Sequence, residues 1–129
     1  MKPWPFATKR AAPPFNKNVL SINNDAVIFH GSTNATQTKA ENAAFLGAIF
    51  KLVDSLYYEN IKRLPTPEGF VQHHAVTGVF KDGTPIPPLQ CCIVATVTNG
   101  KISRLNEFFD AAQFQELWDR LAVSQATAD

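Results

Sequence analysis

The sequence has little net charge and lacks the marks of several common binding functions. Its 12 basic and 11 acidic residues give a net charge of +1 over 129 residues, so the cationic surface that binds nucleic acid or an anionic membrane is not expected. No apolar run approaches the roughly 20 residues of a membrane span. The basic residues near the N-terminus are not joined to the apolar stretch of a signal peptide. These absences predict a cytoplasmic protein with no nucleic-acid or membrane partner.

Cysteine is scarce as well. The two cysteines, Cys91 and Cys92, are adjacent, and neighbours in a strand point to opposite faces, which disfavours a disulfide between them. There is no metal-type Cys/His spacing, no glycine-rich phosphate loop and no Ser/His/Asp pattern. We therefore expect neither a metal nor another cofactor, and we expect Cys92 to act as a small hydrophobic residue rather than as a nucleophile.

What the sequence does contain is enough apolar and aromatic material for one core. Apolar residues make up 45% of the chain, and ten of them are phenylalanines, which predicts a single domain over residues 1–129 with an aromatic-lined interior. Residues 1–18 are atypical, because their four prolines leave room only for a short helix over residues 4–12. Another turn of helix is expected over residues 19–24.

The remaining pattern predicts helices packed on an antiparallel sheet. Thr38 and Glu41 have the spacing of a capping box, and the apolar stripe that follows predicts a largely buried helix. Asn99-Gly100 is a strong signal for a two-residue hairpin turn. Asp110 caps the last expected helix. The expected strands are residues 26–30, 55–63, 70–80, 89–98 and 101–109, with a polar loop over residues 31–37. This order is typical of an α+β domain.

Counting back from the hairpin turn predicts which side chains share a face of the sheet. Thr98 would oppose Lys101, and an unbroken ladder would then place Cys92 opposite Glu107. One face would carry Cys92, Val94, Thr96, Ser103, Leu105, Glu107 and Phe109, and the other would carry Cys91, Ile93, Ala95, Val97, Ile102, Arg104, Asn106 and Phe108. Both faces are substantially apolar, so we expect a pocket and helices on one face and a second copy of the chain on the other.

Glu107 is the leading candidate for chemistry. Flanked by Leu105 and Phe109 on its face, its carboxyl group should have a pKa raised by desolvation, which suits a general acid or base near neutral pH. The alternatives are a solvated face or an ion pair with Arg63 or another cation. His30, at the end of the first strand, has a ring suited to proton transfer, and the alternative is a hydrogen-bonded histidine at the sheet edge.

The adjacent histidines and tyrosines offer further candidates for the pocket. A simple count places His73 opposite Cys92 and beside Glu107, whereas a one-residue bulge would select His74; either could instead be a structural histidine. One of Tyr57 and Tyr58 would donate a hydrogen bond into the pocket. Trp4 and Phe6 would roof the pocket. Asp110 fits a helix cap better than a second catalytic carboxylate.

Two segments resemble the SnoaL-like branch of the nuclear transport factor 2-like proteins. They are Asp25-Ala26-Val27-Ile28-Phe29-His30-Gly31, and the stretch from Gly69 to Leu117 that contains Asn99-Gly100-Lys101-Ile102 and Asn106-Glu107-Phe108-Phe109-Asp110. The resemblance covers roughly residues 15–121. It implies a cone-shaped curved sheet with helices on its concave side, and an interior that often holds a small molecule.

The resemblance narrows the chemistry without selecting one reaction. Ketosteroid isomerases use an aspartate base, and an oxyanion hole made of a tyrosine and a protonated aspartate. In this sequence His30 stands at the position of the base, the position of the second aspartate falls near Cys92, and the N-terminal segment has no tyrosine. The usual ketosteroid isomerase mechanism is therefore disfavoured. The Arg-x-Asp pair of the fold's epoxide hydrolases is replaced by Gln72-His73-His74. Of the reactions known for this fold that were compared, only an acid/base reaction like that of the polyketide cyclases is compatible with these residues.

These observations lead to one leading hypothesis and one alternative. The leading hypothesis is a cytoplasmic, homodimeric, cofactor-independent acid/base isomerase, cyclase or hydrolase that acts on a small apolar carbonyl- or hydroxyl-bearing compound. Its expected catalytic residues are Glu107, His30 and His73, and its expected binding residues are Tyr57, Tyr58, His74, Cys92, Leu105, Phe109 and Trp4. The alternative is a non-catalytic ligand carrier or dimerisation module of the same fold.

Overall fold

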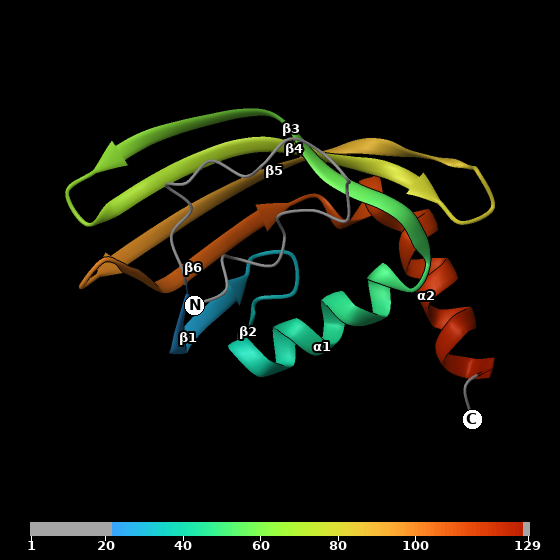
Figure 1. The fold of residues 1–129 in the computed structure, drawn as a ribbon, viewed down its shortest axis with the longest axis horizontal. Coiled ribbons are helices and arrows are strands. Elements are labelled where there is room, and N and C mark those ends of the chain that lie inside the picture. Colours follow the sequence, from blue (N-terminus) through green and yellow to red (C-terminus); the bar gives the residue numbers. More distant parts are fainter. Residues whose placement is uncertain (1–21, 128–129) are drawn as a thin grey trace.

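A computed structural model of the chain describes residues 22–127 (Figure 1). The elements are β1 (Ile22–His30), β2 (Ala35–Thr38), α1 (Lys39–Phe50), β3 (Val53–Thr66), β4 (Gly69–Phe80), β5 (Pro85–Thr98), β6 (Lys101–Phe109), the 3-10 helix η2 (Ala111–Phe114) and α2 (Gln115–Thr127). The helix expected over residues 4–12 and the roof expected from Trp4 and Phe6 lie outside the described residues.

The six strands form one curved sheet, in the order β2-β1-β6-β5-β4-β3. Both α-helices lie on the same, concave side of it (Figure 1). The α+β architecture expected from the sequence is therefore confirmed. The sheet is mixed rather than antiparallel, because β1 pairs with β6 in parallel while every other pair is antiparallel. Among residues 22–127, no helix is long and apolar enough to cross a bilayer.

The local sequence signals form the structures they predict. The Thr38 hydroxyl accepts a hydrogen bond from the Glu41 amide at 3.1 Å, and the Glu41 carboxylate accepts one from the Thr38 amide at 2.9 Å, which completes the capping box. Asn99 and Gly100 have φ of 52° and 78°, as the expected two-residue hairpin turn requires. The Asp110 carboxylate accepts from the Ala112 amide at 3.0 Å and so caps the 3-10 helix that leads into α2.

The N-terminal half differs from expectation in two places. Strand β1 begins at Ile22, so the helical turn expected over residues 19–24 is wrong for residues 22–24. The polar loop expected over residues 31–37 instead contains the short strand β2, which returns beside β1 and pairs Ala35 with His30. Because β2 lies at the sheet edge and carries only Ala, Thr and Gln, it has no hydrophobic pattern that could have predicted it.

A bulge in the β5–β6 hairpin changes which residues share a face. Thr98 opposes Lys101 and Val97 opposes Ile102, but Thr96 then opposes Arg104, which leaves Ser103 as an extra residue in β6. The Ser103 hydroxyl hydrogen-bonds the Thr98 hydroxyl at 2.9 Å and the Thr96 carbonyl at 3.3 Å. Because the bulge shifts the register by one residue, every residue of β6 beyond it shares a face with the other set of β5 side chains.

Two buried clusters fill the concave side of the sheet. The first joins β1, β5 and β6 and contains Ile22, Ala26, Ile28, Cys91, Ile93, Ile102 and Leu105. The second joins α1, η2 and α2 to strands β3–β5 and contains Ile49, Val53, Leu56, Phe80, Ile86, Leu89, Phe114 and Leu117. Val76 and Phe109 pack against both clusters, and the cavity described below lies where these two side chains meet the helices.

Candidate functional site

A cavity of about 400 Å³ lies between the concave face of the sheet and the two helices. That volume falls within the range of small-molecule sites in proteins, roughly 300–1,000 Å³. Aliphatic and aromatic side chains from α1, η2, α2 and strands β3–β6 make up most of the wall. The polar lining side chains are His30, Ser32, Thr33, Gln37, Tyr58, Cys91 and Glu107.

An aromatic cluster lines the helical side of the cavity. The Trp118 ring lies 6.0 Å from Phe45, 6.3 Å from Phe109 and 5.9 Å from Phe114, measured between ring centroids. The indole N–H donates to the Ala111 carbonyl at 3.0 Å, so the one polar atom of the Trp118 side chain is already hydrogen-bonded within the protein. The helical wall therefore offers a ligand apolar ring surface.

At the polar end of the cavity, Glu107 and His30 form a pair. They occupy opposed positions on β6 and β1, because the parallel pairing of these strands places His30 beside Glu107. The His30 Nδ1 atom lies 3.2 Å from Glu107 Oε1. Glu107 is only 7% exposed. The hydrogen bond to Glu107 raises the pKa of His30, against the opposing effect of burial, and Gln37 and the charge of Glu107 raise it further.

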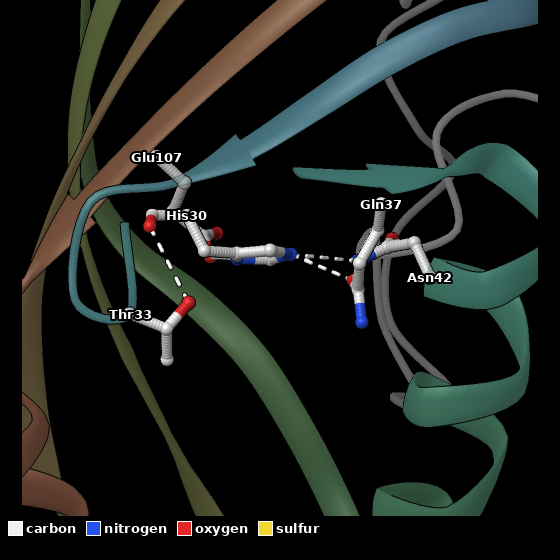
Figure 2. Close-up of polar contacts among 5 residues, drawn as sticks. All are labelled: His30, Thr33, Gln37, Asn42 and Glu107. Carbon is white, nitrogen blue, oxygen red and sulfur yellow. Dashed lines mark hydrogen bonds and ion pairs between the residues drawn. The ribbon is translucent and has the colours of Figure 1, made fainter. Parts of the chain in front are cut away.

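The far nitrogen of His30 contacts two amide side chains (Figure 2). His30 Nε2 lies 2.7 Å from Gln37 Oε1 and 3.4 Å from Asn42 Nδ2. Asn42 also donates to Gln37 Oε1 at 3.1 Å. Strand β2 supplies Gln37, and the buried stripe of α1 supplies Asn42 together with Leu46 and Ile49. The imidazole ring is therefore held at both of its nitrogens.

Two further side chains, Tyr58 and Cys91, interact with the Glu107 carboxylate. Burial raises the pKa of Tyr58 well above its usual value, and the charge of Glu107 raises it further. Burial also raises the pKa of the Cys91 thiol, which is hydrogen-bonded to Glu107. Tyr58 and Cys91 consequently keep their protons at neutral pH. Cys91 is thus a poor nucleophile, because the thiolate is the reactive form of cysteine.

The structure brings four of the ten expected site residues to the cavity wall: Glu107, His30, Tyr58 and Phe109. Leu105 is buried in the first hydrophobic cluster, and Tyr57, the neighbour of Tyr58 on β3, is not part of the wall. His74 is fully buried next to the cavity, with its ring stacked on Tyr58 at 3.7 Å. Trp4 lies outside the described residues.

The placement of His73 and Cys92 beside Glu107 is wrong. These two residues do oppose one another, as the count predicted, but Cys92 pairs with Phe108, whereas Glu107 pairs with Ile93. The bulge at Ser103 is the physical reason, since it shifts β5 by one residue against β6. His73 is exposed and hydrogen-bonded to Gln90 at 2.8 Å. The inward-facing histidine is His74.

The sequence-based reasoning missed two residues that hold His30. Gln37 lies in the segment interpreted as a loop, and no periodic pattern singled it out. Asn42 did carry a signal, because it lies four residues before Leu46 and seven before Ile49, on the stripe that the helix buries. A polar residue on such a stripe needs a hydrogen-bond partner. Within residues 22–127, no group of three or more His, Cys, Asp or Glu side chains is arranged to hold a metal ion.

Comparison with known proteins gives matches in structure only. No sequence-family profile and no curated protein matches the chain. An NTF2-like protein of unknown function from Burkholderia pseudomallei superimposes with a TM-score of 0.63 at 16% identity, covering 75% of this chain and 79% of that one. A Catenulispora acidiphila protein with a ketosteroid isomerase-like fold, in complex with trimethylamine, gives 0.61 at 12% identity, covering 78% and 79%. The chain has the nuclear transport factor 2-like fold.

TerC, crystallised with polyporic acid, also superimposes on this chain, with a TM-score of 0.61 at 18% identity over 75% of this chain and 79% of TerC. The resemblance found in the sequence is thus confirmed for the fold. Identities below 20% carry no activity from one protein to another, so function has to be argued from the cavity itself.

Proposed function

We propose that this chain is an acid/base enzyme that transfers a proton within a small, apolar, carbonyl- or hydroxyl-bearing compound, with Glu107 as the acid/base. The observation that carries the proposal is the position of the Glu107 carboxylate, which lines an otherwise largely apolar cavity of about 400 Å³ and is held there by His30. Exclusion of water strengthens electrostatic interactions with a reacting group.

The proposed step is a proton transfer that needs no cofactor. The Glu107 carboxylate removes a proton from a carbon next to a substrate carbonyl, and the electron pair of the C–H bond moves into an enolate. The same carboxyl group then returns the proton to another atom of the enolate, so atoms and charge balance. A correctly placed acid/base of this kind contributes about 10²–10⁴-fold to rate.

The charges around the cavity favour neutral ligands. Among residues 22–127, no lysine or arginine lines the wall. The two wall residues of this part of the chain that carry charge near neutral pH, His30 and Glu107, are paired with each other. A bound carboxylate or phosphate would therefore be buried without a cation of its own, which is costly. A fused-ring phenol or ketone would instead place its rings against Trp118 and its polar atom near Glu107.

Calorimetric titration with two similar ring compounds tests the ligand class. We expect 2-naphthol, which is neutral, to bind, and 2-naphthoate, which has the same rings and a negative charge, to bind at least tenfold more weakly. Substitution of Ile49, on the cavity wall, by Trp should weaken 2-naphthol binding by filling the space. Tighter binding of 2-naphthoate would contradict the proposal.

A non-catalytic ligand carrier is the alternative, and the aromatic cluster around Trp118 is the feature that favours it. A carrier would bind 2-naphthol equally well in the wild type and in Glu107→Gln and would accelerate no proton transfer in either. An enzyme would lose catalysis in Glu107→Gln while keeping its ligand, because the substitution removes a base and leaves the wall unchanged.

We also propose that the outer face of the sheet pairs with a second copy of the chain. Val27, Val94 and Phe108 lie on this face, and they are 36%, 39% and 44% exposed. Phe29 adds a ring 6.1 Å from that of Phe108. Apolar side chains grouped on one face are typical of an interface between proteins.

A further inference from the structure

The hydrogen bonds around His30 define the orientation of the Gln37 amide. Asn42 is 2% exposed, and its Nδ2 atom lies 3.1 Å from Gln37 Oε1. An amide NH₂ group can only donate, so Gln37 has to present its oxygen to Asn42 rather than its own NH₂. The same oxygen lies 2.7 Å from His30 Nε2. Asn42 thereby aims an acceptor at the far nitrogen of His30.

Acceptors therefore face both nitrogens of the His30 ring. Glu107 Oε1 lies 3.2 Å from Nδ1, and Gln37 Oε1 lies 2.7 Å from Nε2. The Asn42 NH₂ group is farther from Nε2, at 3.4 Å. A neutral imidazole has one N–H, so beside an ionised Glu107 either neutral tautomer would leave a nitrogen lone pair directed at the nearest oxygen. The imidazolium ion donates from both nitrogens and satisfies both contacts.

We propose that Asn42 and Gln37 are positioning residues that hold His30 as an imidazolium ion through neutral pH, so that His30 is a fixed cation beside Glu107 and Glu107 alone exchanges protons with the ligand. This inference deepens the proposed function and rests on it for the role of Glu107. It assigns His30 to the orientation and charge balance of Glu107, in place of the proton transfer for which the sequence made it a candidate.

The burial of the cluster strengthens the argument. Glu107 and Asn42 are almost completely buried, and an unsatisfied or wrongly oriented polar group costs most where water cannot reach it. The raised pKa of His30, to which the hydrogen bond that His30 donates to Gln37 contributes, agrees with this arrangement. With the cation fixed, the resting pair carries no net charge.

Histidine-detected NMR on the full chain tests the proposal. The chain has only three histidines, and the spectrum of a His30→Gln variant identifies the His30 signals. In the wild type we expect both ring nitrogens of His30 to be protonated at pH 7, with a titration midpoint above the ordinary 6.5. Gln37→Leu removes the acceptor at Nε2 and should lower the midpoint by about one unit.

A double substitution separates orientation from packing. Asn42→Leu frees the Gln37 amide to rotate and present its NH₂ group to Nε2, so the His30 midpoint should fall. Gln37→Glu supplies a side chain whose two oxygens both accept, and it should raise the midpoint. In the Gln37→Glu background, Asn42→Leu should cause no fall, because a carboxylate has no wrong orientation.

Two results would overturn the proposal: a wild-type His30 that is neutral at pH 7, or a midpoint that does not move in Gln37→Leu. Both Gln37 variants alter a half-buried side chain on an edge strand and should fold, so they decide the outcome even if Asn42→Leu does not fold. The readout is independent of turnover. If His30 titrates as predicted but Glu107→Gln keeps full catalysis, the proposed function and the role of Glu107 are refuted, while the assignment of His30 as an imidazolium ion held by Gln37 and Asn42 remains.

Discussion

His74 should make the protein sensitive to mild acid. Its ring is completely buried and stacked on Tyr58. Gln72 accepts a hydrogen bond from Arg63 at 2.6 Å through its oxygen, so its NH₂ group is the one that donates to His74 Nδ1 at 2.9 Å. His74 Nδ1 is therefore an acceptor, as in a neutral ring. Burial, with smaller contributions from neighbouring His73 and Arg63, lowers the pKa of His74 to about 4.

The size of the effect follows from the difference between the folded and unfolded states. In the unfolded chain His74 should titrate near 6.5. Between pH 6.5 and about pH 4 the unfolded state binds the proton and the folded state does not, so stability rises with pH across this window. The contribution is fully present above pH 6.5 and is lost as the pH falls toward 4. Its magnitude is roughly 3 kcal/mol.

Urea unfolding of the wild type and of His74→Phe at pH 7.5, 6.5, 5.5 and 4.5 measures this contribution. Phenylalanine keeps a ring against Tyr58 and does not titrate, so the wild type should lose about 2–3 kcal/mol more than the variant between pH 6.5 and 4.5. His73→Gln, one residue away on the exposed face, should behave like the wild type. Equal losses in the wild type and His74→Phe would refute the reasoning, and His74→Gln repeats the comparison with a smaller side chain.

Two further predictions concern packing and assembly. Gly78→Ala would place a methyl group on the Ser55 carbonyl of the neighbouring strand and should destabilise the fold by about 3 kcal/mol or more. Gly47→Ala in α1 would meet no atom of residues 22–127 within 4 Å beyond its chain neighbours and the helix backbone, and it should stabilise the fold by about 0.5–1 kcal/mol. Thermal unfolding of both variants checks the pair. Phe108→Asp and Val94→Asp, on the outer sheet face, should each shift the chain from dimer to monomer in sedimentation velocity, and a wild type that is monomeric at high concentration would contradict the proposed interface.

Signals carried by neighbouring residues predicted the local structure well. The Thr38 capping box, the Asn99-Gly100 turn and the Asp110 cap each depend on a few consecutive residues, and each forms as expected. The pairing of strands distant in the sequence could not be predicted from such local signals. The parallel pairing that puts His30 beside Glu107 joins residues 77 positions apart, and no local pattern encodes it.

The candidate site was predicted only in part, because its composition also depends on how distant strands pair. Glu107 and His30 were chosen for their chemistry and their place at strand positions, and both line the cavity. His73 and Cys92 were chosen by counting along an unbroken ladder, and the bulge at Ser103 moved them to the other face. A bulge is invisible to alternation, because both faces of this hairpin are apolar and either register buries hydrophobic side chains.

Deuterium exchange into 2-tetralone, a neutral fused-ring ketone with an acidic C–H next to its carbonyl, tests the central claim most directly. Proton NMR in deuterated buffer would follow loss of the C–H signal with the wild type, with Glu107→Gln and with His73→Gln as the control outside the cavity. We predict that the wild type and His73→Gln accelerate exchange and that Glu107→Gln loses at least 100-fold of that acceleration. Equal exchange in the wild type and Glu107→Gln, or no acceleration of a ketone that binds in the cavity, would contradict the assignment of Glu107 as an acid/base in this pocket.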